Sequence, residues 1–272
     1  MKIVKLTGVI GAELLDVDIS RDLSSQKISD IRQALLENKV IFFRGQQLSP
    51  EQHIAFTEKF GEISRSPVYQ TLSTHPQIMP VVKEPKDKDV IGDTWHTDET
   101  YQSAPPMGSL LYARHVPEVG GDTLFADLYR AYDTLSEALQ RQIGALRAVH
   151  SNELLNASAR NASRTTKLRE DIGQIESVHP VVRIHEETGR KLLFVNQPFT
   201  MRFEGMTKGE SQPLLQYLFT HASKPENTCR CRWQPGSLAF WDNRCTMHYA
   251  VNDYPGFRRE MHRITIQGAE PR

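Results

Sequence analysis

Cysteine and long apolar runs are both scarce in this sequence. Three cysteines in 272 residues are too few, and odd in number, for a disulfide framework, so they favour a reducing compartment. The longest apolar runs, at 40–43 and 192–195, are far shorter than the roughly 20 residues that cross a bilayer. Charged residues interrupt the apolar stretch at the start of the sequence, which argues against a secretory signal. We therefore expect a cytoplasmic protein with no membrane span.

The sequence also lacks an excess of charge of either sign. Its 33 lysines and arginines balance its 33 acidic residues, so no overall field attracts nucleic acid or an anionic membrane. An anionic ligand would have to be bound by local basic residues. Hydrophobic residues at 39% and charged residues at 24% lie near globular averages, which excludes a disordered, collagen-like or coiled-coil chain. The length allows one large domain or two small ones.

Short strands dominate the pattern, and the helices lie mostly near the beginning. The spacing of apolar residues predicts a helix over 23–38. Capping boxes at 49–52 and 207–210 predict two more helices, ending near 61 and 221. Strand-like segments occur at 40–43, 109–113, 123–127, 181–184, 191–195, 229–233, 237–241 and 263–266. This order favours a mainly β fold, a sandwich or barrel with flanking helices.

Two segments show little periodicity and are predicted to be mobile loops. Residues 71–93 are rich in proline, lysine and aspartate and come directly before a Trp-His-Thr-Asp motif at 95–98. Residues 152–176 are largely polar and basic. This second loop is either a solvated linker or a lid over a site.

His96 and Asp98 are the first candidates for metal chemistry. In an extended backbone, side chains at i and i+2 point to the same face and can share one metal ion. Chance alone supplies about one His-x-acid triplet in this composition, and a second triplet occurs at 185–187. We interpret the second as the charged tip of a hairpin, because a Thr-Gly turn follows it. A hydrogen-bonded strand histidine is the structural alternative for His96.

A third ligand and an anion clamp would have to come from the C-terminal part of the chain. His248 follows an apolar strand and a polar turn, so it could face inward; a histidine satisfied by its neighbours is the alternative. A zinc site that adds His248 to the three cysteines is disfavoured, because the i, i+2 spacing of Cys229 and Cys231 is not that of a zinc knuckle. The basic cluster at 258–263 is either a solvated surface or, beside a metal, a carboxylate clamp.

Several motifs are specific in combination where each alone is not. They lie at 95–98, 120–123, 241–244, 248–250, 258–259 and 261–263. In this combination the chain resembles the taurine dioxygenase (TauD/TfdA) family of Fe(II)- and 2-oxoglutarate-dependent dioxygenases, over nearly its whole length. The resemblance implies a double-stranded β-helix, or jelly roll, formed by a single domain over residues 1–272.

The resemblance also implies a ligand set and a cosubstrate. Fe(II) would be held by His96, Asp98 and His248, which leaves positions open for small molecules. The cosubstrate 2-oxoglutarate would chelate the iron, and its far carboxylate would meet Arg259 and the hydroxyl of Thr123. With O2, decarboxylation to succinate and CO2 would be coupled to hydroxylation of a substrate C–H bond. The carboxylate of Asp98 favours hydroxylation over halogenation.

The substrate contacts implied by the resemblance point away from taurine. Arg263 matches a sulfonate-binding position, and Tyr69 and Phe199 match aromatic residues of the pocket. Ser66 stands where taurine-binding relatives have a histidine, and Gly92 or a neighbour stands where they have an amine-contacting asparagine. Without these contacts a buried amine would be left unpaired. We therefore expect another small organic anion, such as an alkyl sulfate, a sulfonate or an aryloxyalkanoate.

Two functional alternatives stay open. The same iron site could act on an amino-acid-like biosynthetic intermediate, by hydroxylation or desaturation. The chain could also be a metal-binding jelly roll without turnover. Relatives commonly form dimers or tetramers, so the resemblance implies a homo-oligomer, and no nucleic-acid or membrane partner is expected.

Overall fold

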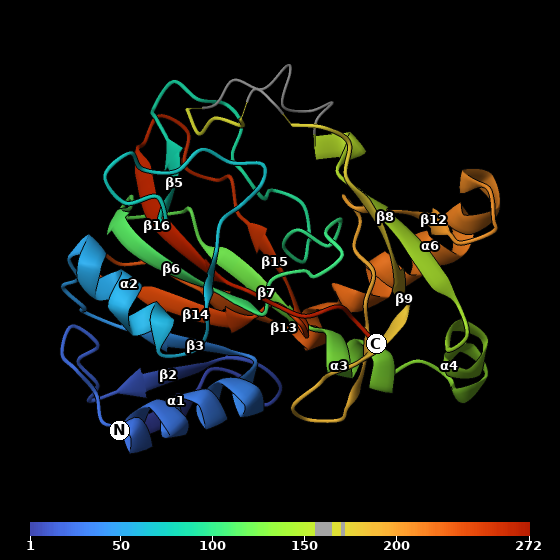
Figure 1. Ribbon diagram of the computed structural model, residues 1–272, viewed down its shortest axis with the longest axis horizontal. Helices are drawn as coiled ribbons and strands as arrows, with labels where there is room; N and C mark the ends of the chain where they lie inside the picture. Colours follow the sequence, from blue (N-terminus) through green and yellow to red (C-terminus); the bar gives the residue numbers. More distant parts are fainter. Residues whose placement is uncertain (156–164, 170–171) are drawn as a thin grey trace.

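The computed structural model describes residues 1–155, 165–169 and 172–272. Two β-sheets form its centre (Figure 1). The larger sheet contains, in spatial order, β1 (Lys2–Lys5), β2 (Ala12–Leu15), β3 (Val40–Phe43), β14 (Leu238–Asp242), β6 (Gly108–His115), β16 (Arg259–Ile266) and β4 (Ile63–Ser64), and β5 (Met79–Lys83) pairs with β16. The smaller sheet contains β13 (Thr228–Cys231), β7 (Thr123–Asp127) and β15 (Thr246–Ala250). This mainly β arrangement is a jelly roll, as the sequence predicts.

Strand β3 shows why two apolar layers form around the larger sheet. Val40 and Phe42 belong to the core between the two sheets, together with residues of β7 and β14. Ile41 and Phe43 belong to a second core beneath α1 (Ser25–Asn38) and α2 (Pro50–Glu58). Because side chains alternate along a strand, a strand that is buried on both faces is apolar throughout. The uninterrupted apolar run at 40–43 meets this condition.

The predicted helices begin where their capping residues indicate. Ser24 caps α1. Reciprocal capping boxes form between Ser49 and Gln52 at α2, and between Thr207 and Glu210 at α6 (Lys208–Ala222). Each box satisfies backbone N–H groups that the first helical turn leaves unpaired. These three helix predictions are confirmed.

A second layer lies beside the jelly roll (Figure 1). It contains the sheet of β12 (Thr200–Phe203), β8 (Arg147–Ser151) and β9 (Glu176–Pro180), the hairpin of β10 (Val182–Ile184) and β11 (Lys191–Leu193), and the helices α3 (Leu128–Asp133), α4 (Glu137–Ile143) and α6. A separate apolar core holds much of this layer together. The sequence patterns miss α3 and α4, because helices of 6 and 7 residues are too short to show a clear period. No helix in the described ranges is long and apolar enough to cross a membrane.

The first predicted loop differs from expectation, and the second is described only in part. Residues 71–93 include strand β5, which pairs with β16 over five residues. Its proline and lysine hide the strand signal, because these residues are depleted in strands. In the second predicted loop, residues 156–164 and 170–171 lie outside the described residues. Leu168, which is described, forms a β-bridge with Tyr69.

The segment at 185–187 is not simply a charged hairpin tip, because its histidine is fully buried. His185 Nδ1 accepts hydrogen bonds from the N–H groups of Glu187 and Thr188, and its Nε2 donates to Asp242 Oδ2 at 3.0 Å. Arg244 in turn binds both carboxylate oxygens of Asp242, at 2.9 Å and 2.7 Å, and Glu187 at 2.7 Å. The hairpin is thereby tied to the turn between β14 and β15.

Replacing Arg244 by methionine should therefore destabilise the fold strongly. The change leaves the buried carboxylate of Asp242 without its main partner, and breaking a buried pair costs about 3–5 kcal/mol. Urea unfolding followed by circular dichroism measures the loss. As a control, Arg141→Met removes an ion pair with Glu137 whose side chains are exposed, and its cost should stay below about 1 kcal/mol. Equal costs for the two variants would contradict this account.

Candidate active site

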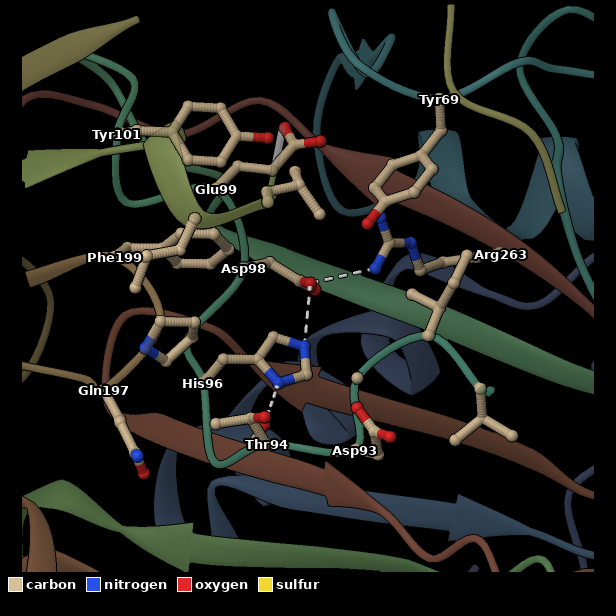
Figure 2. A pocket seen from close by; sticks show the side chains of 16 residues that line it. Tyr69, Asp93, Thr94, His96, Asp98, Glu99, Tyr101, Gln197, Phe199 and Arg263 are labelled. Atoms are coloured by element: carbon tan, nitrogen blue, oxygen red, sulfur yellow. Dashed lines mark hydrogen bonds and ion pairs between the residues drawn. The ribbon is translucent and has the colours of Figure 1, made fainter. Parts of the chain in front are cut away.

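A cavity of about 310 Å³ brings together residues from distant parts of the chain (Figure 2). One part of its wall is charged or polar, and another part is apolar. The lining residues are Tyr69, Val90, Ile91, Gly92, Asp93, Thr94, His96, Asp98, Glu99, Tyr101, Leu154, Leu155, Gln197, Pro198, Phe199 and Arg263. Six of the sixteen lie in the single segment 90–96, so this segment positions much of the wall.

His96 and His248 are neighbours because their backbones pair. The N–H of His96 donates to the carbonyl of His248 at 3.0 Å, and the N–H of His248 donates to the carbonyl of His96 at 2.8 Å. Residues that exchange both hydrogen bonds in an antiparallel pair carry their side chains on the same face. The centroids of the two imidazole rings therefore lie only 4.0 Å apart.

Asp98 is brought to the same point by a clamp on its backbone. The side chain of Asn243 accepts a hydrogen bond from the N–H of Asp98 at 2.8 Å and donates one to its carbonyl at 3.1 Å. The hydroxyl of Thr97 donates to the carbonyl of Thr246 at 2.9 Å. The turn between β14 and β15 thus holds the segment that carries the acid. These contacts give a physical reason for the motif at 241–244.

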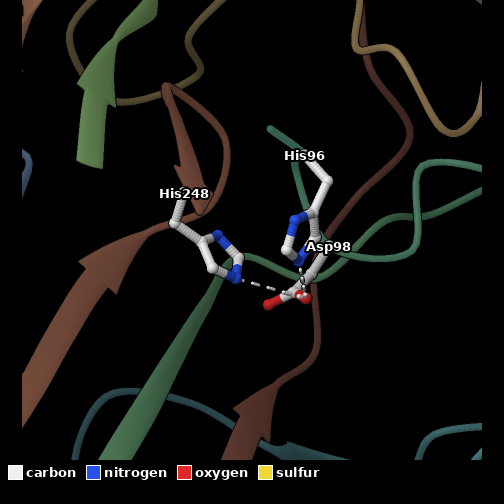
Figure 3. A group of neighbouring side chains, drawn as sticks. All are labelled: His96, Asp98 and His248. Atoms are coloured by element: carbon white, nitrogen blue, oxygen red, sulfur yellow. Dashed lines mark ion pairs between the residues drawn. The ribbon is translucent and has the colours of Figure 1, made fainter. Parts of the chain in front are cut away.

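Ligand atoms of the three residues converge (Figure 3). His96 Nε2 and His248 Nε2 lie 3.7 Å and 3.8 Å from Asp98 Oδ1, and one atom from each residue lies within 4.8 Å of the others. His96 Nδ1 lies 2.7 Å from the carbonyl of Thr94, so it carries the proton and Nε2 presents its lone pair. Two imidazoles and a carboxylate on one face are the donor set of non-haem Fe(II) oxygenases. The residues present therefore fit a ferrous ion.

The protonation states of the three side chains also fit a metal ion. Burial lowers the pKa of His96 and holds the pKa of His248 well below its usual range. Burial alone would raise the pKa of Asp98, but the charge of Arg263 opposes this most strongly and, with the neighbouring imidazoles and a hydrogen bond from Ser109, brings the pKa to about 2. Neutral imidazoles and an ionised carboxylate are the forms that bind metal. At neutral pH the site can therefore bind a cation without first releasing protons.

Arg259 and Arg263 lie on one face of β16. Residues 259–263 pair with β5 in unbroken register, so Arg259, Met261 and Arg263 share a face. Met261 belongs to the core between the sheets, which shows that this face points inward. Both guanidinium groups are buried, so the solvated-surface alternative is wrong for these two arginines.

Arg259 is a buried cation that lacks an anionic partner. It makes no hydrogen bond or ion pair within the described residues, and its Nε is buried without a partner. A small cavity connects it with His96, His248 and Thr123. The hydroxyl oxygen of Thr123 accepts from the indole N–H of Trp233 at 2.9 Å, which leaves its own hydrogen free to donate. A buried charge requires a partner, so this end of the cavity fits the far carboxylate of a dicarboxylic acid.

Arg263, Tyr69 and Phe199 line the larger cavity next to the three candidate ligands. Arg263 Nη1 donates to Asp98 Oδ1 at 2.9 Å, and its guanidinium lies 5.9 Å from the ring centroid of Tyr69. The ring of Phe199 meets His96 edge to face, with 6.5 Å between centroids. The structure therefore brings all three residues to the space where a substrate would meet the metal.

Ser66 is placed differently from expectation. It does not line the cavity, and its hydroxyl donates a hydrogen bond to the carboxylate of Glu99. Its position does not support the predicted direct contact with substrate, because Glu99 occupies the wall instead. Sequence reasoning also missed Asp93 and Gln197 as lining residues. The only available signal for Glu99 was its place directly after the His-x-Asp motif.

Comparisons with known proteins agree with this geometry. The sequence model of the taurine catabolism dioxygenase TauD, TfdA family matches residues 2–265. An alkylsulfatase from Acinetobacter baylyi is 39% identical over 98% of this chain and 85% of its own length. An alpha-ketoglutarate-dependent sulfate ester dioxygenase from Pseudomonas putida is 36% identical over 98% of this chain and 89% of its own. A crystal structure of a taurine dioxygenase from Burkholderia xenovorans matches with a TM-score of 0.84 at 36% identity, covering 99% of this chain and 90% of the other.

The close approach of Gly92 to His96 gives a test of the metal site. A Cβ at Gly92 would lie 2.8 Å from Cε1 of His96, and the backbone φ is +83°. Gly92→Ala should displace the imidazole and weaken Mn(II) binding about tenfold or more, the effect of disturbing the support of a metal ligand. Calorimetric titration of the metal-free protein with Mn(II) measures the change.

Gly45→Ala is the matched control. Its φ is +62°, but no atom lies within 4 Å of the added Cβ. The control carries similar backbone strain and should leave the Mn(II) affinity unchanged. Equal Mn(II) affinities in wild type and the Gly92 variant would show that the contact with His96 has no influence on metal binding.

Proposed function

Since this chain belongs to the TauD/TfdA family of taurine catabolism dioxygenases, it is an Fe(II)- and 2-oxoglutarate-dependent dioxygenase, and we propose that it hydroxylates a C–H bond of a small organic anion. A sulfonate, an alkyl sulfate or an aryloxyalkanoate is the type of substrate proposed. Hydroxylation at a carbon next to oxygen or sulfur gives an unstable product that collapses.

One observation carries this proposal: the convergence of His96, Asp98 and His248 at the wall of a cavity that also contains Arg263. The two imidazoles and the carboxylate are proposed to hold Fe(II). A facial triad leaves positions open for small molecules, and here such molecules would reach the ion from the cavity that His96 and Asp98 line. A guanidinium beside this open side supports an anionic substrate, because its forked donors match a carboxylate, sulfonate or sulfate group.

The bound iron and 2-oxoglutarate supply the oxidation of the C–H bond by O2. The protein supplies binding and orientation. Arg259 and the hydroxyl of Thr123 are proposed to hold the far carboxylate of the cosubstrate, and Arg263 the acidic group of the substrate. Tyr69 and Phe199 close the wall around the substrate. The burial of all these side chains excludes water, which strengthens each electrostatic contact.

The remaining expectations belong to the same proposal. The match over residues 2–265 supports a single dioxygenase domain. Three buried cysteines without a disulfide support a cytoplasmic location. A homo-oligomer, a dimer or tetramer, is supported by two exposed apolar side chains, Val119 at 75% and Phe257 at 60% exposure. Their loops are neighbours, because the N–H of Gly121 in one loop donates a hydrogen bond to Asp253 in the other. Together they offer an apolar surface that a second copy of the chain could cover.

Removal of a proposed iron ligand should abolish turnover. With Fe(II), 2-oxoglutarate and O2, the wild type should release succinate slowly even without substrate, whereas His96→Ala and Asp98→Ala should release none above background. Succinate is measured by chromatography. Full activity in either variant would remove the metal assignment, and absence of succinate from the wild type would leave the non-catalytic jelly roll as the better account.

Replacement of Arg259 by lysine should raise the KM for 2-oxoglutarate strongly. The charge is kept, but the forked donor geometry that matches a carboxylate is lost. Loss of one of two such hydrogen bonds to a charged group costs about 1.5–3 kcal/mol, which is a factor of about ten or more in KM. Arg141→Lys, at an exposed pair with Glu137, is the control and should leave KM unchanged. An unchanged KM in Arg259→Lys would place the cosubstrate elsewhere.

A further inference from the structure

Glu99 puts a carboxylate into the wall of the substrate cavity, beside the arginine that is proposed to bind the substrate. Its side chain is buried at 4% exposure, and it lines the same cavity as Arg263. The two groups lie within electrostatic reach of each other. The oxygens of Glu99 are hydrogen-bond acceptors, which a site for a plain anion does not require.

The local structure holds the Glu99 carboxylate in place. The backbone of Glu99 has a φ of +52°, a conformation that non-glycine residues adopt at a cost and that tends to occur at functional sites. One carboxylate oxygen accepts a hydrogen bond from Ser66 and the other from Gln102. Each oxygen can accept a further hydrogen bond, so the carboxylate is fixed and still has acceptor capacity.

Two buried donors near Glu99 lack acceptors. The hydroxyl of Tyr101 is buried without a partner, and Figure 2 shows it directed toward the side of the cavity where Glu99 lies. The Nε of Arg263 is also buried without a partner, and within the described residues its guanidinium makes one hydrogen bond, to Asp98. Buried donors without acceptors are costly, so a bound molecule should bring acceptor atoms to this place.

These observations define a subsite with both donors and an acceptor. We propose that Glu99 makes the Arg263 end of the cavity selective for acids that also carry a hydrogen-bond donor, a hydroxyl or an N–H group, within a few atoms of the acidic group. The acidic group would meet Arg263 and Tyr101, and the donor would meet Glu99. An acid with acceptor atoms only would place those atoms beside the fixed carboxylate of Glu99 with no donor between them, and this repulsion disfavours its binding.

This inference rests on the proposed function and names a narrower substrate class for the same site: organic acids of the proposed types that also carry a donor. It replaces the expectation that a buried amine would be left unpaired, because Glu99 supplies an acceptor that the sequence analysis did not consider. The test uses matched pairs of acids that differ only in one donor: hexanoate against 2-hydroxyhexanoate, and hexane-1-sulfonate against 2-hydroxyhexane-1-sulfonate. Dissociation constants are measured by calorimetry on the protein loaded with Mn(II) and N-oxalylglycine, which does not turn over. Substrate-stimulated succinate release with Fe(II) and 2-oxoglutarate is measured in parallel.

The variant Glu99→Gly removes the carboxylate, and glycine adopts a positive φ without strain. Asp93→Asn changes a carboxylate of the wall that is not a proposed iron ligand and serves as the matched variant. We expect the wild type to bind the hydroxylated member of a pair at least tenfold more tightly, which corresponds to about 1.4 kcal/mol. Glu99→Gly should lose this preference, and Asp93→Asn should keep it. Glu99→Met, which keeps the length of the side chain but has no strong acceptor, provides a second variant if the glycine variant does not fold.

Three results would overturn the inference: no preference in the wild type, a preference that survives in both Glu99 variants, or a preference lost in Asp93→Asn alone. Failure of the proposed function has a different signature. In that case the wild type releases no succinate with Fe(II), while the calorimetric comparison with Mn(II) still reports on Glu99.

Discussion

One pair of backbone hydrogen bonds, exchanged between His96 and His248, sets the geometry on which the site depends. Strand β15 belongs to the jelly roll, whereas His96 lies in a connecting segment without regular structure apart from this bridge. Because the two residues are directly opposite each other, their imidazoles share a face whatever the rest of the segment does. Gly92 and Asp98, on either side of His96 in the sequence, consequently line the same cavity as His96. A bridge of one residue pair thus converts an irregular loop into part of a rigid site.

The turn from β14 to β15 supports this bridge from behind. Asn243 fixes the backbone of Asp98, and the adjacent Asp242 is held by Arg244 and His185. All of these side chains are buried and hydrogen-bonded, so the turn has little freedom to move. Stability and function are therefore linked at this turn, since a network that holds a hairpin to the jelly roll also orients the carboxylate of the candidate metal site. The motif at 241–244 is better explained by this support than by contact with a ligand.

The sequence predicts what depends on local pattern. Local interactions alone account for some elements. The structure confirms the helices indicated by the capping boxes at 49–52 and 207–210, and the strand indicated by the apolar run at 40–43. Strand β5 could not be predicted in this way, because its Pro80 and Lys83 are tolerated only through pairing with β16. The same holds in the site. A spacing of two residues suggests that His96 and Asp98 act together, but nothing local shows that Ser66 lies behind Glu99, because their contact joins residues 33 positions apart.

Strand β16 supplies an arginine to each of the two cavities. Arg259 lines the small cavity, and Arg263 lines both. Arg259 and Arg263 are four residues apart on the inward face, which at about 3.3 Å per residue separates their backbones by roughly 13 Å. Met261 lies between them in the core, and the three candidate metal ligands lie near the second arginine, since Arg263 binds Asp98 directly. Arg263 already has an anionic partner in Asp98, whereas Arg259 forms no ion pair within the described residues, so the Arg259 end requires an anionic group of its own, separate from any group bound at Arg263. A dicarboxylic cosubstrate at Arg259 and a separate acidic substrate at Arg263 would satisfy this requirement. One strand can supply both arginines because residues at an even spacing along a β-strand share a face.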